Sequence, residues 1–243
     1  MGVHAYFSSD DSAEEALRLF TQAIEHKQSL AKSYLMRGAS KEILKQYPEA
    51  LEDLQASQAL DVSNPRLFYY YGQLYFREGL NYRAIHYFDS AIAKDAKSAD
   101  FYNARAIVES TQGAFDKVLA DEDMALRLDS VNDNYLINRG FARTRLNEPD
   151  EAVADYNRAL TIKKTQKGFA NRGYAYAQLG KFEQAIADYT SALTFNPSDG
   201  QVLCLRGICF KALGKKESAC ADFKKSAALQ YQPALQLVRD NCD

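Results

Sequence analysis

The sequence predicts an all-α fold in which antiparallel helix pairs stack side by side, and three observations predict it. Small residues recur at gaps of 34, 34, 34, 33 and 34 residues. Within each interval the apolar residues have helical spacing. Only five Pro and 12 Gly interrupt 243 residues, which suits long helical segments. A fixed period of this length indicates a repeat protein whose stacked units share a core. The recurring residues are Gly38, Gly72, Ala106, Gly140, Gly173 and Gly207.

Each repeat reads as a helix, a tight turn and a second helix. The clearest copy runs from Phe169 to Ser198, and Gly180-Lys181 separates its two apolar faces. Asn196-Pro197 ends the second helix, because the residue before proline avoids the helical region. The small residue permits close approach of the two helices. Sixteen residues after it comes a mostly aromatic slot, occupied in turn by Leu54, Phe88, Glu122, Tyr156, Tyr189 and Phe223.

These intervals divide the chain into one solenoid over residues 1–243. It comprises a partial first repeat over 1–30, repeats over 31–64, 65–98, 99–132, 133–165, 166–199 and 200–232, and a capping helix over 233–243. A capping box at Ser12-Ala13-Glu14-Glu15 predicts the start of the first complete helix. Phe7 falls in the register of a preceding helix, so we expect a trimmed or processed form of a longer protein.

A second small slot follows each first one by twelve residues and holds Ala50, Ala84, Val118, Ala152, Ala185 and Ala219. The period, this pair of small slots, the aromatic slot and the terminal Asn-Pro resemble those of the tetratricopeptide repeat (TPR) family from Ala13 to about Leu229. The resemblance implies a right-handed α-α superhelix whose first helices line a concave groove. It also implies a protein-interaction role. Two departures are local: Val118 and Glu122 occupy a small and an aromatic slot, and the repeat over 133–165 is one residue short.

A second regularity pairs an arginine of each first helix with an aspartate sixteen residues later. The repeat that lacks the arginine, at Tyr71, also lacks the aspartate and has Tyr87. This joint loss predicts a structural ion pair between the helices, and a ligand clamp is the less favoured alternative. The predicted pairs are Arg37/Asp53, Arg105/Asp121, Arg139/Asp155, Arg172/Asp188 and Arg206/Asp222.

The family geometry implies that first-helix residues outside the packing face line the groove. Amides there can pair with the backbone of an extended peptide, aromatic rings can anchor apolar groups, and cations can bind carboxylates. The groove candidates are Tyr70, Gln73, Arg77, Asn103, Asn138, Phe141, Arg145, Lys167, Asn171, Tyr174 and Lys211.

We therefore expect a non-catalytic scaffold or adaptor that binds an extended peptide or a partner's helix in the groove. The mixed but locally basic groove favours a partner segment with some acidic residues. The alternative is a structural or oligomerisation module, cut from a larger protein, that docks through its exposed N-terminal face, with a homo-oligomer as one outcome.

The sequence shows no pattern typical of catalysis, and we expect no enzyme, cofactor or metal site. His4, His26 and His86 are isolated, and no phosphate-binding glycine motif occurs. A net charge of -2 argues against nucleic acid as a partner. No apolar run is long enough to span a bilayer, so no direct membrane insertion is expected.

The four cysteines lie within the last 40 residues, at spacings that do not match a zinc site. Two interpretations stay open: free or buried thiols, which the spacing favours, or a bridge between Cys220 and Cys242. The chain's ending also resembles terminal repeats of some secreted bacterial TPR proteins, which supports the bridge. A bridge and a trimmed N-terminus would imply a periplasmic or secreted protein, and the default is cytoplasmic.

Overall fold

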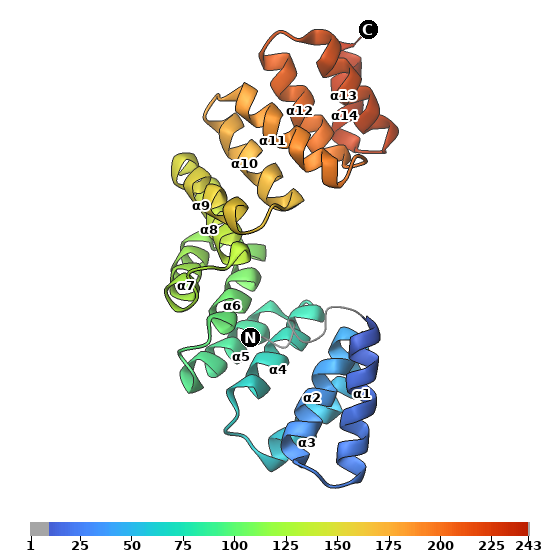
Figure 1. Ribbon diagram of the computed structural model, residues 1–243, viewed down its shortest axis with the longest axis vertical. Coiled ribbons are helices and arrows are strands. Elements are labelled where there is room, and N and C mark those ends of the chain that lie inside the picture. The colour runs from blue at the N-terminus through green and yellow to red at the C-terminus, as the bar shows by residue number, and fades with distance from the viewer. Residues whose placement is uncertain (1–9, 243) are drawn as a thin grey trace. The chain divides into compact units, whose positions relative to one another are not determined.

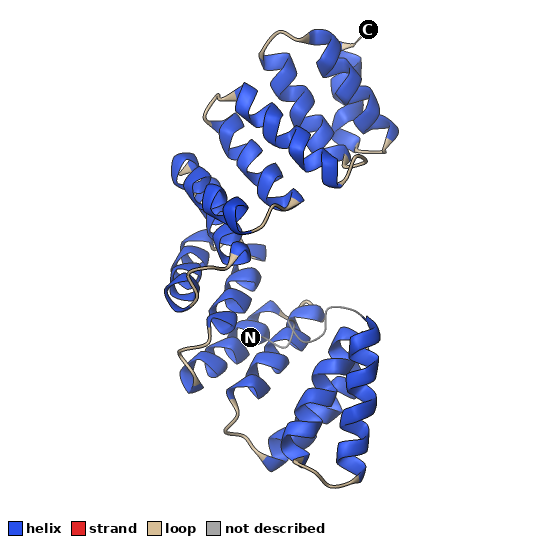
Figure 2. Cartoon of the chain, in the orientation of Figure 1, coloured by secondary structure: helices blue, strands red, loops and turns tan. Residues whose placement is uncertain are grey.

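The computed structural model describes residues 10–242, which form fourteen α-helices and no β-strand (Figures 1 and 2). The predicted all-α class is therefore confirmed. Two helices lie in each stretch predicted as a repeat, with α2 beginning at Leu30, and the exact repeat boundaries stay a prediction. The predicted capping segment holds one helix.

The chain forms two compact units, Met1–Ala114 and Phe115–Asp243. The predicted single solenoid over residues 1–243 stays a prediction. The first unit contains α1 (Asp10–Glu25), α2 (Leu30–Ile43), α3 (Tyr47–Leu60), α4 (Pro65–Arg77), α5 (Asn81–Lys94) and α6 (Ala99–Thr111). The second unit contains α7 (Phe115–Leu128), α8 (Asp133–Arg145), α9 (Pro149–Ile162), α10 (Gln166–Gln178), α11 (Phe182–Phe195), α12 (Gly200–Ala212), α13 (Lys216–Ala228) and α14 (Gln232–Asn241).

Within each unit the helices stack in chain order, and the first helices of successive repeats also touch. In the first unit α2 contacts α4 and α4 contacts α6. In the second unit α8 contacts α10 and α10 contacts α12. Each unit therefore carries a surface built from neighbouring first helices (Figure 1).

The small residue of each first helix is required by the ring that packs on it. A Cβ added to Gly72 would lie 2.6 Å from the Phe88 ring. One added to Gly207 would lie equally close to the Phe223 ring, at 2.6 Å. Both rings are buried against the backbone of the partner helix, so this contact sets the interhelical distance in both units.

The N-terminal helix differs from the prediction. The expected capping box placed the helix start at Ser12, and this is wrong because α1 begins at Asp10. The predicted half-helix around Phe7 lies outside the described residues.

Candidate functional site

Arginine–aspartate pairs join the two helices of four repeats. In each pair the guanidinium donates two hydrogen bonds of 2.5–2.9 Å to the carboxylate. The four aspartates are buried, with 2–5% of their surface exposed. The pairs therefore act between helices inside a repeat. They are Arg37–Asp53, Arg139–Asp155, Arg172–Asp188 and Arg206–Asp222.

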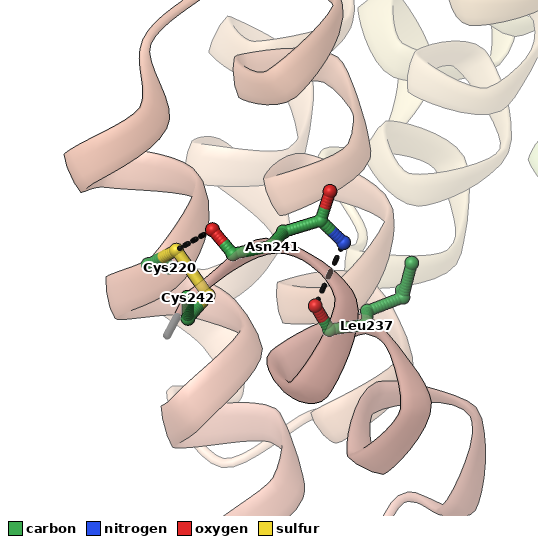
Figure 3. Close-up of a disulfide and its surroundings, with 4 residues drawn as sticks. All are labelled: Cys220, Leu237, Asn241 and Cys242. Carbon is green, nitrogen blue, oxygen red and sulfur yellow. Dashed lines mark hydrogen bonds between the residues drawn. A yellow bond between two sulfur atoms is a disulfide. The ribbon is translucent and has the colours of Figure 1, made fainter.

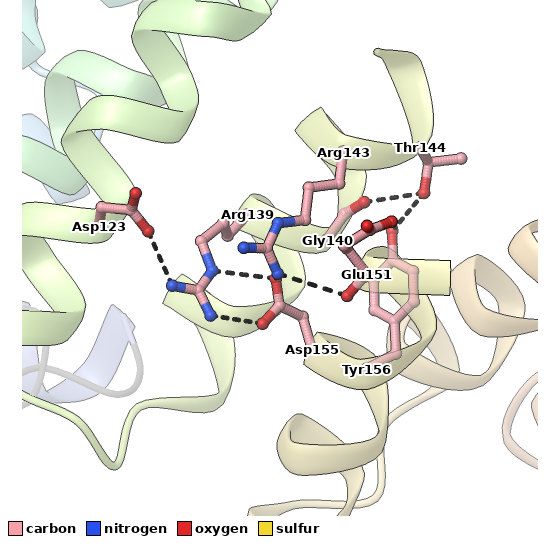
Figure 4. Close-up of polar contacts among 8 residues, drawn as sticks. All are labelled: Asp123, Arg139, Gly140, Arg143, Thr144, Glu151, Asp155 and Tyr156. Atoms are coloured by element: carbon pink, nitrogen blue, oxygen red, sulfur yellow. Dashed lines mark hydrogen bonds and ion pairs between the residues drawn. The ribbon is translucent and has the colours of Figure 1, made fainter. Parts of the chain in front are cut away.

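The pair in α8 and α9 is part of a larger network (Figure 4). Asp155 also accepts a hydrogen bond from Arg143 at 2.7 Å, and Arg139 donates a further one to Asp123 of α7 at 2.7 Å. Hydrogen bonds to Asp155 and Asp123 raise the pKa of Arg139 above its ordinary value. One buried carboxylate thus holds two arginines, and Arg139 links three helices of the second unit.

The predicted pair Arg105/Asp121 is not among these four pairs. Arg105 lies in the first unit, and its guanidinium is 2.5 Å from the carboxylate of Asp89 in α5. Asp121 belongs to the second unit. The pairing of Arg105 with Asp121 therefore stays a prediction.

An aromatic stack occupies the place of the missing ion pair. The rings of Tyr71 and Tyr87 stack with centroids 5.0 Å apart, and the ring of Tyr75 also stacks with that of Tyr87, at 5.2 Å. The Tyr71 hydroxyl donates a hydrogen bond of 2.9 Å to Gln58. The joint replacement seen in the sequence is therefore an exchange of one interhelical contact for another.

The second unit holds a pocket of about 470 Å³ among α8, α10 and α12, which we call the groove. Five predicted groove residues line it: Phe141, Arg145, Lys167, Asn171 and Tyr174. Tyr156, which the sequence placed in an aromatic packing slot, also lines the groove, and the other lining residues are Thr144, Gln166, Ala170, Asp199, Gln201, Val202 and Leu205.

The two equivalent asparagines, Asn138 and Asn171, differ in their partners. Asn138 donates to Glu122 at 3.1 Å and accepts from Lys167 at 3.2 Å, so both ends of its amide have partners within the protein. The Nδ2 atom of Asn171 is buried and makes no hydrogen bond of normal geometry, although the Asn171 side chain interacts with the Tyr156 hydroxyl and opposes the rise that burial causes in the pKa of Tyr156. The structure thus leaves the amide donor of Asn171 unsatisfied at the groove and places Asn138 in a polar chain that holds Lys167.

The acidic residue of this hydrogen-bond network, Glu122, is fully buried and occupies the slot that is aromatic in most other repeats. Burial raises the pKa of Glu122 to about 8, while the hydrogen bond from Asn138 acts in the opposite direction. Its Oε2 atom has no partner. The sequence does show a polar residue, Glu122, in a slot that is usually aromatic. It does not show that Glu122 is linked to Lys167, because this link depends on side-chain positions that spacing does not give.

Asp199 is a groove residue that sequence reasoning missed. It caps α12 by accepting from the backbone N–H of Val202 at 3.0 Å, and its other oxygen accepts from Gln166 at 2.7 Å. An aspartate just before a helix is a capping signal that could have been found. Its pairing with Gln166 joins α12 to α10 and needs the stacked structure.

The first-unit candidates make internal contacts instead. Tyr70 is buried in the hydrophobic core with 4% of its surface exposed, which corrects its assignment as a groove anchor. Gln73 donates to the hydroxyl of Tyr69 at 2.9 Å. Arg77 donates to Glu42 of α2 at 3.0 Å, and Asn103 is half-buried on α6.

Lys211 lies apart from the groove residues. It lines a separate pocket of about 320 Å³ near the C-terminal end of the second unit, together with Gly214, Lys216, Ala219, Cys220, Asp240 and Asn241. The prediction that grouped Lys211 with the groove is not supported by this placement.

A disulfide joins Cys220 of α13 to Cys242, which follows α14 (Figure 3). The two Cα atoms are 5.4 Å apart, and Asn241 next to the bridge donates from its amide to the Leu237 carbonyl at 2.7 Å. Cys204 and Cys209 are buried free cysteines. The structure thus contains the bridge, the interpretation that the spacing alone favoured less.

The described part of the chain covers residues 10–242. In that range no three His, Cys, Asp or Glu side chains are grouped so that they could hold a metal ion. Among the described helices, none combines the length and the apolar character needed to cross a bilayer.

Comparison with protein families gives matches over three segments. Models described as tetratricopeptide repeat match residues 44–99, 134–166 and 167–199. No curated protein matches the sequence significantly.

Several solved structures are similar in fold. The Cut9–Hcn1 hetero-tetramer of the APC/C has a TM-score of 0.80 at 15% identity, covering 95% of this chain and 46% of that one. This chain thus spans less than half of that relative. YrrB, described as a TPR protein with an unusual peptide-binding site, has a TM-score of 0.64 at 16% identity, covering 76% and 97% of the two chains. PilF of Pseudomonas aeruginosa has a TM-score of 0.77 at 13% identity, covering 87% and 97%.

Proposed function

We propose that this chain, which belongs to the tetratricopeptide repeat family, binds an extended peptide or a partner's helix in the groove of its second unit. Family membership supports a protein-interaction scaffold in general. The proposal adds the place of binding and the kind of ligand.

The observation that carries the proposal is the unsatisfied amide of Asn171. A buried donor without a partner costs free energy, and native proteins keep few of them. Asn171 lines the groove, and its buried Nδ2 atom has to turn outward before the carbonyl of a ligand lying there can accept its hydrogen bond. Every peptide bond carries such a carbonyl, which makes an extended peptide the natural ligand class.

Two aromatic rings give the groove an apolar part as well. Phe141 is 37% exposed and Tyr174 is 39% exposed, and both line the groove. Burial of apolar surface against them would supply affinity, while the amide would fix the orientation of the peptide backbone. YrrB is described as having a peptide-binding site, and we propose the same ligand class here.

The proposal is tested by selection from a random-peptide phage library on the immobilised full chain. Selected peptides are then synthesised and titrated against two variants. Ala170→Trp fills the groove and should weaken binding at least about tenfold. Tyr82→Ala removes a ring that is 86% exposed in the first unit and should leave affinity unchanged. Equal binding to the wild type and Ala170→Trp would refute the groove as the binding site.

A further inference from the structure

Arginine occupies the same first-helix slot in both units, but only the arginine of the first unit has an acidic partner. Arg77 follows Gly72 by five residues, and Arg145 follows Gly140 by five. Arg77 is neutralised by Glu42, which lies 35 residues earlier and accepts its hydrogen bond at 3.0 Å. The residue 35 positions before Arg145 is Ser110, which carries no charge.

Arg145 is held by an aromatic ring and not by an acid. Its guanidinium carbon lies 5.4 Å from the centroid of the Phe115 ring, and Phe115 in turn meets the ring of Phe141 edge-on at 6.0 Å. No carboxylate of residues 10–242 lies within ion-pair distance of Arg145. The Phe115 ring therefore orients the Arg145 guanidinium at the edge of the groove, and no acidic side chain neutralises its charge.

The second groove cation, Lys167, is also without a charged partner at hydrogen-bond distance. It donates to the neutral amide of Asn138 at 3.2 Å. Partial burial lowers the pKa of Lys167, and the carboxyl of Glu122 behind Asn138 acts in the opposite direction. Because burial raises the pKa of Glu122 to about 8, that acid is mostly protonated at neutral pH and does not balance the charge of Lys167.

The acid that lines the groove does not balance these cations either. Both oxygens of Asp199 already accept hydrogen bonds, from Val202 N–H and from Gln166. Its charge also lies at the N-terminus of α12, where the helix dipole stabilises it. The groove therefore presents two cations and one carboxylate to a ligand, and Asp199 forms no ion pair with either cation.

We propose that the groove selects a partner segment that carries an acidic side chain, whose carboxylate is bound by Arg145 with Lys167 nearby. This inference rests on the proposed function and adds the chemistry of the ligand. A carboxylate matches the planar fork of a guanidinium, and it restores in a ligand the partner that Glu42 supplies to Arg77 within the protein.

The test uses the peptides selected from the random library on the full chain. For each selected peptide, a second version is made in which every Asp is replaced by Asn and every Glu by Gln. Wild-type protein should prefer the acidic version at least tenfold, which corresponds to about 1.4 kcal/mol. Arg145→Gln should reduce this preference to less than about twofold, and Arg77→Gln, the matched control, should keep it.

Further measurements separate folding from recognition. Arg145→Lys retains the charge without the planar fork, so it should keep part of the preference, and circular dichroism should show native helix content in all three variants. Selected peptides without acidic residues, or an unchanged preference in Arg145→Gln, would overturn the inference and leave the proposed function intact. A library that yields no binding peptide would overturn the proposed function itself.

Discussion

The surfaces formed by first helices differ between the two units, although their sequences follow one register. In the first unit Arg77 pairs with Glu42 and Gln73 bonds to Tyr69, so the side chains satisfy one another. In the second unit Arg145 has no acid and Asn171 has an unsatisfied donor beside a pocket. A residue type in a repeat slot therefore does not reveal a binding site until its neighbours are known.

The contacts that join the two helices of a repeat also differ between the two units. The second unit joins its helices by ion pairs, whereas one repeat of the first unit uses stacked tyrosines in the same two slots. Both kinds of contact hold two helices together, but they respond differently to substitution and to pH.

The largest effect is expected from the removal of Asp155. Asp155→Ala leaves Arg139 and Arg143 without their shared carboxylate, and breaking a buried pair in this way costs about 3–5 kcal/mol. Urea unfolding measures the loss. Asp123→Ala removes the outer partner of Arg139, whose side chain is 45% exposed, and should cost less than about 1 kcal/mol. Equal losses would contradict the central role given to Asp155.

The bridge at the end of the second unit should contribute about 3 kcal/mol to the stability of that end, because it closes a segment of 22 residues. Cys220→Ser should accelerate amide hydrogen exchange in α14, and the first unit, which has no cysteine, should be unaffected. Thiol titration of the wild type in denaturant without reductant should find two free thiols, Cys204 and Cys209. Four free thiols would contradict the bridge.

The buried acid of the second unit should make its stability depend on pH. The pKa of Glu122 is raised from 4.5 to about 8, so the folded protein binds this proton more tightly than the unfolded chain does. Its stabilising contribution is therefore complete below pH 4.5 and is lost as pH rises through 8.

Glu122→Gln removes this titration while its carbonyl can still accept from Asn138. The variant should exceed the wild type in stability most at pH 9, with a difference that shrinks steadily toward pH 5. Urea titrations at several pH values measure the difference. A gap between the two proteins that is independent of pH would contradict the raised pKa.

The smallest effect is expected from exchanging the aromatic stack for an ion pair. Tyr71→Arg and Tyr87→Asp should each destabilise the first unit by about 1–2 kcal/mol, because each leaves a charge without its partner. The double variant should recover to within about 1 kcal/mol of the wild type. A double variant less stable than either single one would show that the two slots do not exchange as a pair.

Sequence reasoning predicted the helices well, because a repeat with a fixed period repeats the same local signals six times. Small residues facing rings, such as Gly72 with Phe88, predict the pairing of helices directly. The expected start of α1 at Ser12 was wrong, since this residue lies inside the helix, at an end of the pattern that neighbouring copies do not correct.

The groove could be predicted only in part. Register placed Arg145, Lys167 and Asn171 on one surface, and the structure groups them at one pocket. The repeat register could not show that Asn138 and Asn171 differ in their hydrogen bonds. Asn138 donates to Glu122, which lies sixteen positions away on another helix. Nor could the register show that Tyr70 turns into the core, since a slot that faces the groove in one repeat can face a neighbouring helix in another.

The most direct test of the central claim is hydrogen–deuterium exchange of the full chain with and without a selected peptide. We expect slower exchange in α8, α10 and α12, whose side chains form the groove. We expect no change in α2 and α4, whose polar side chains already satisfy one another. Protection confined to α2 and α4, or equal protection in both units, would contradict binding in the groove.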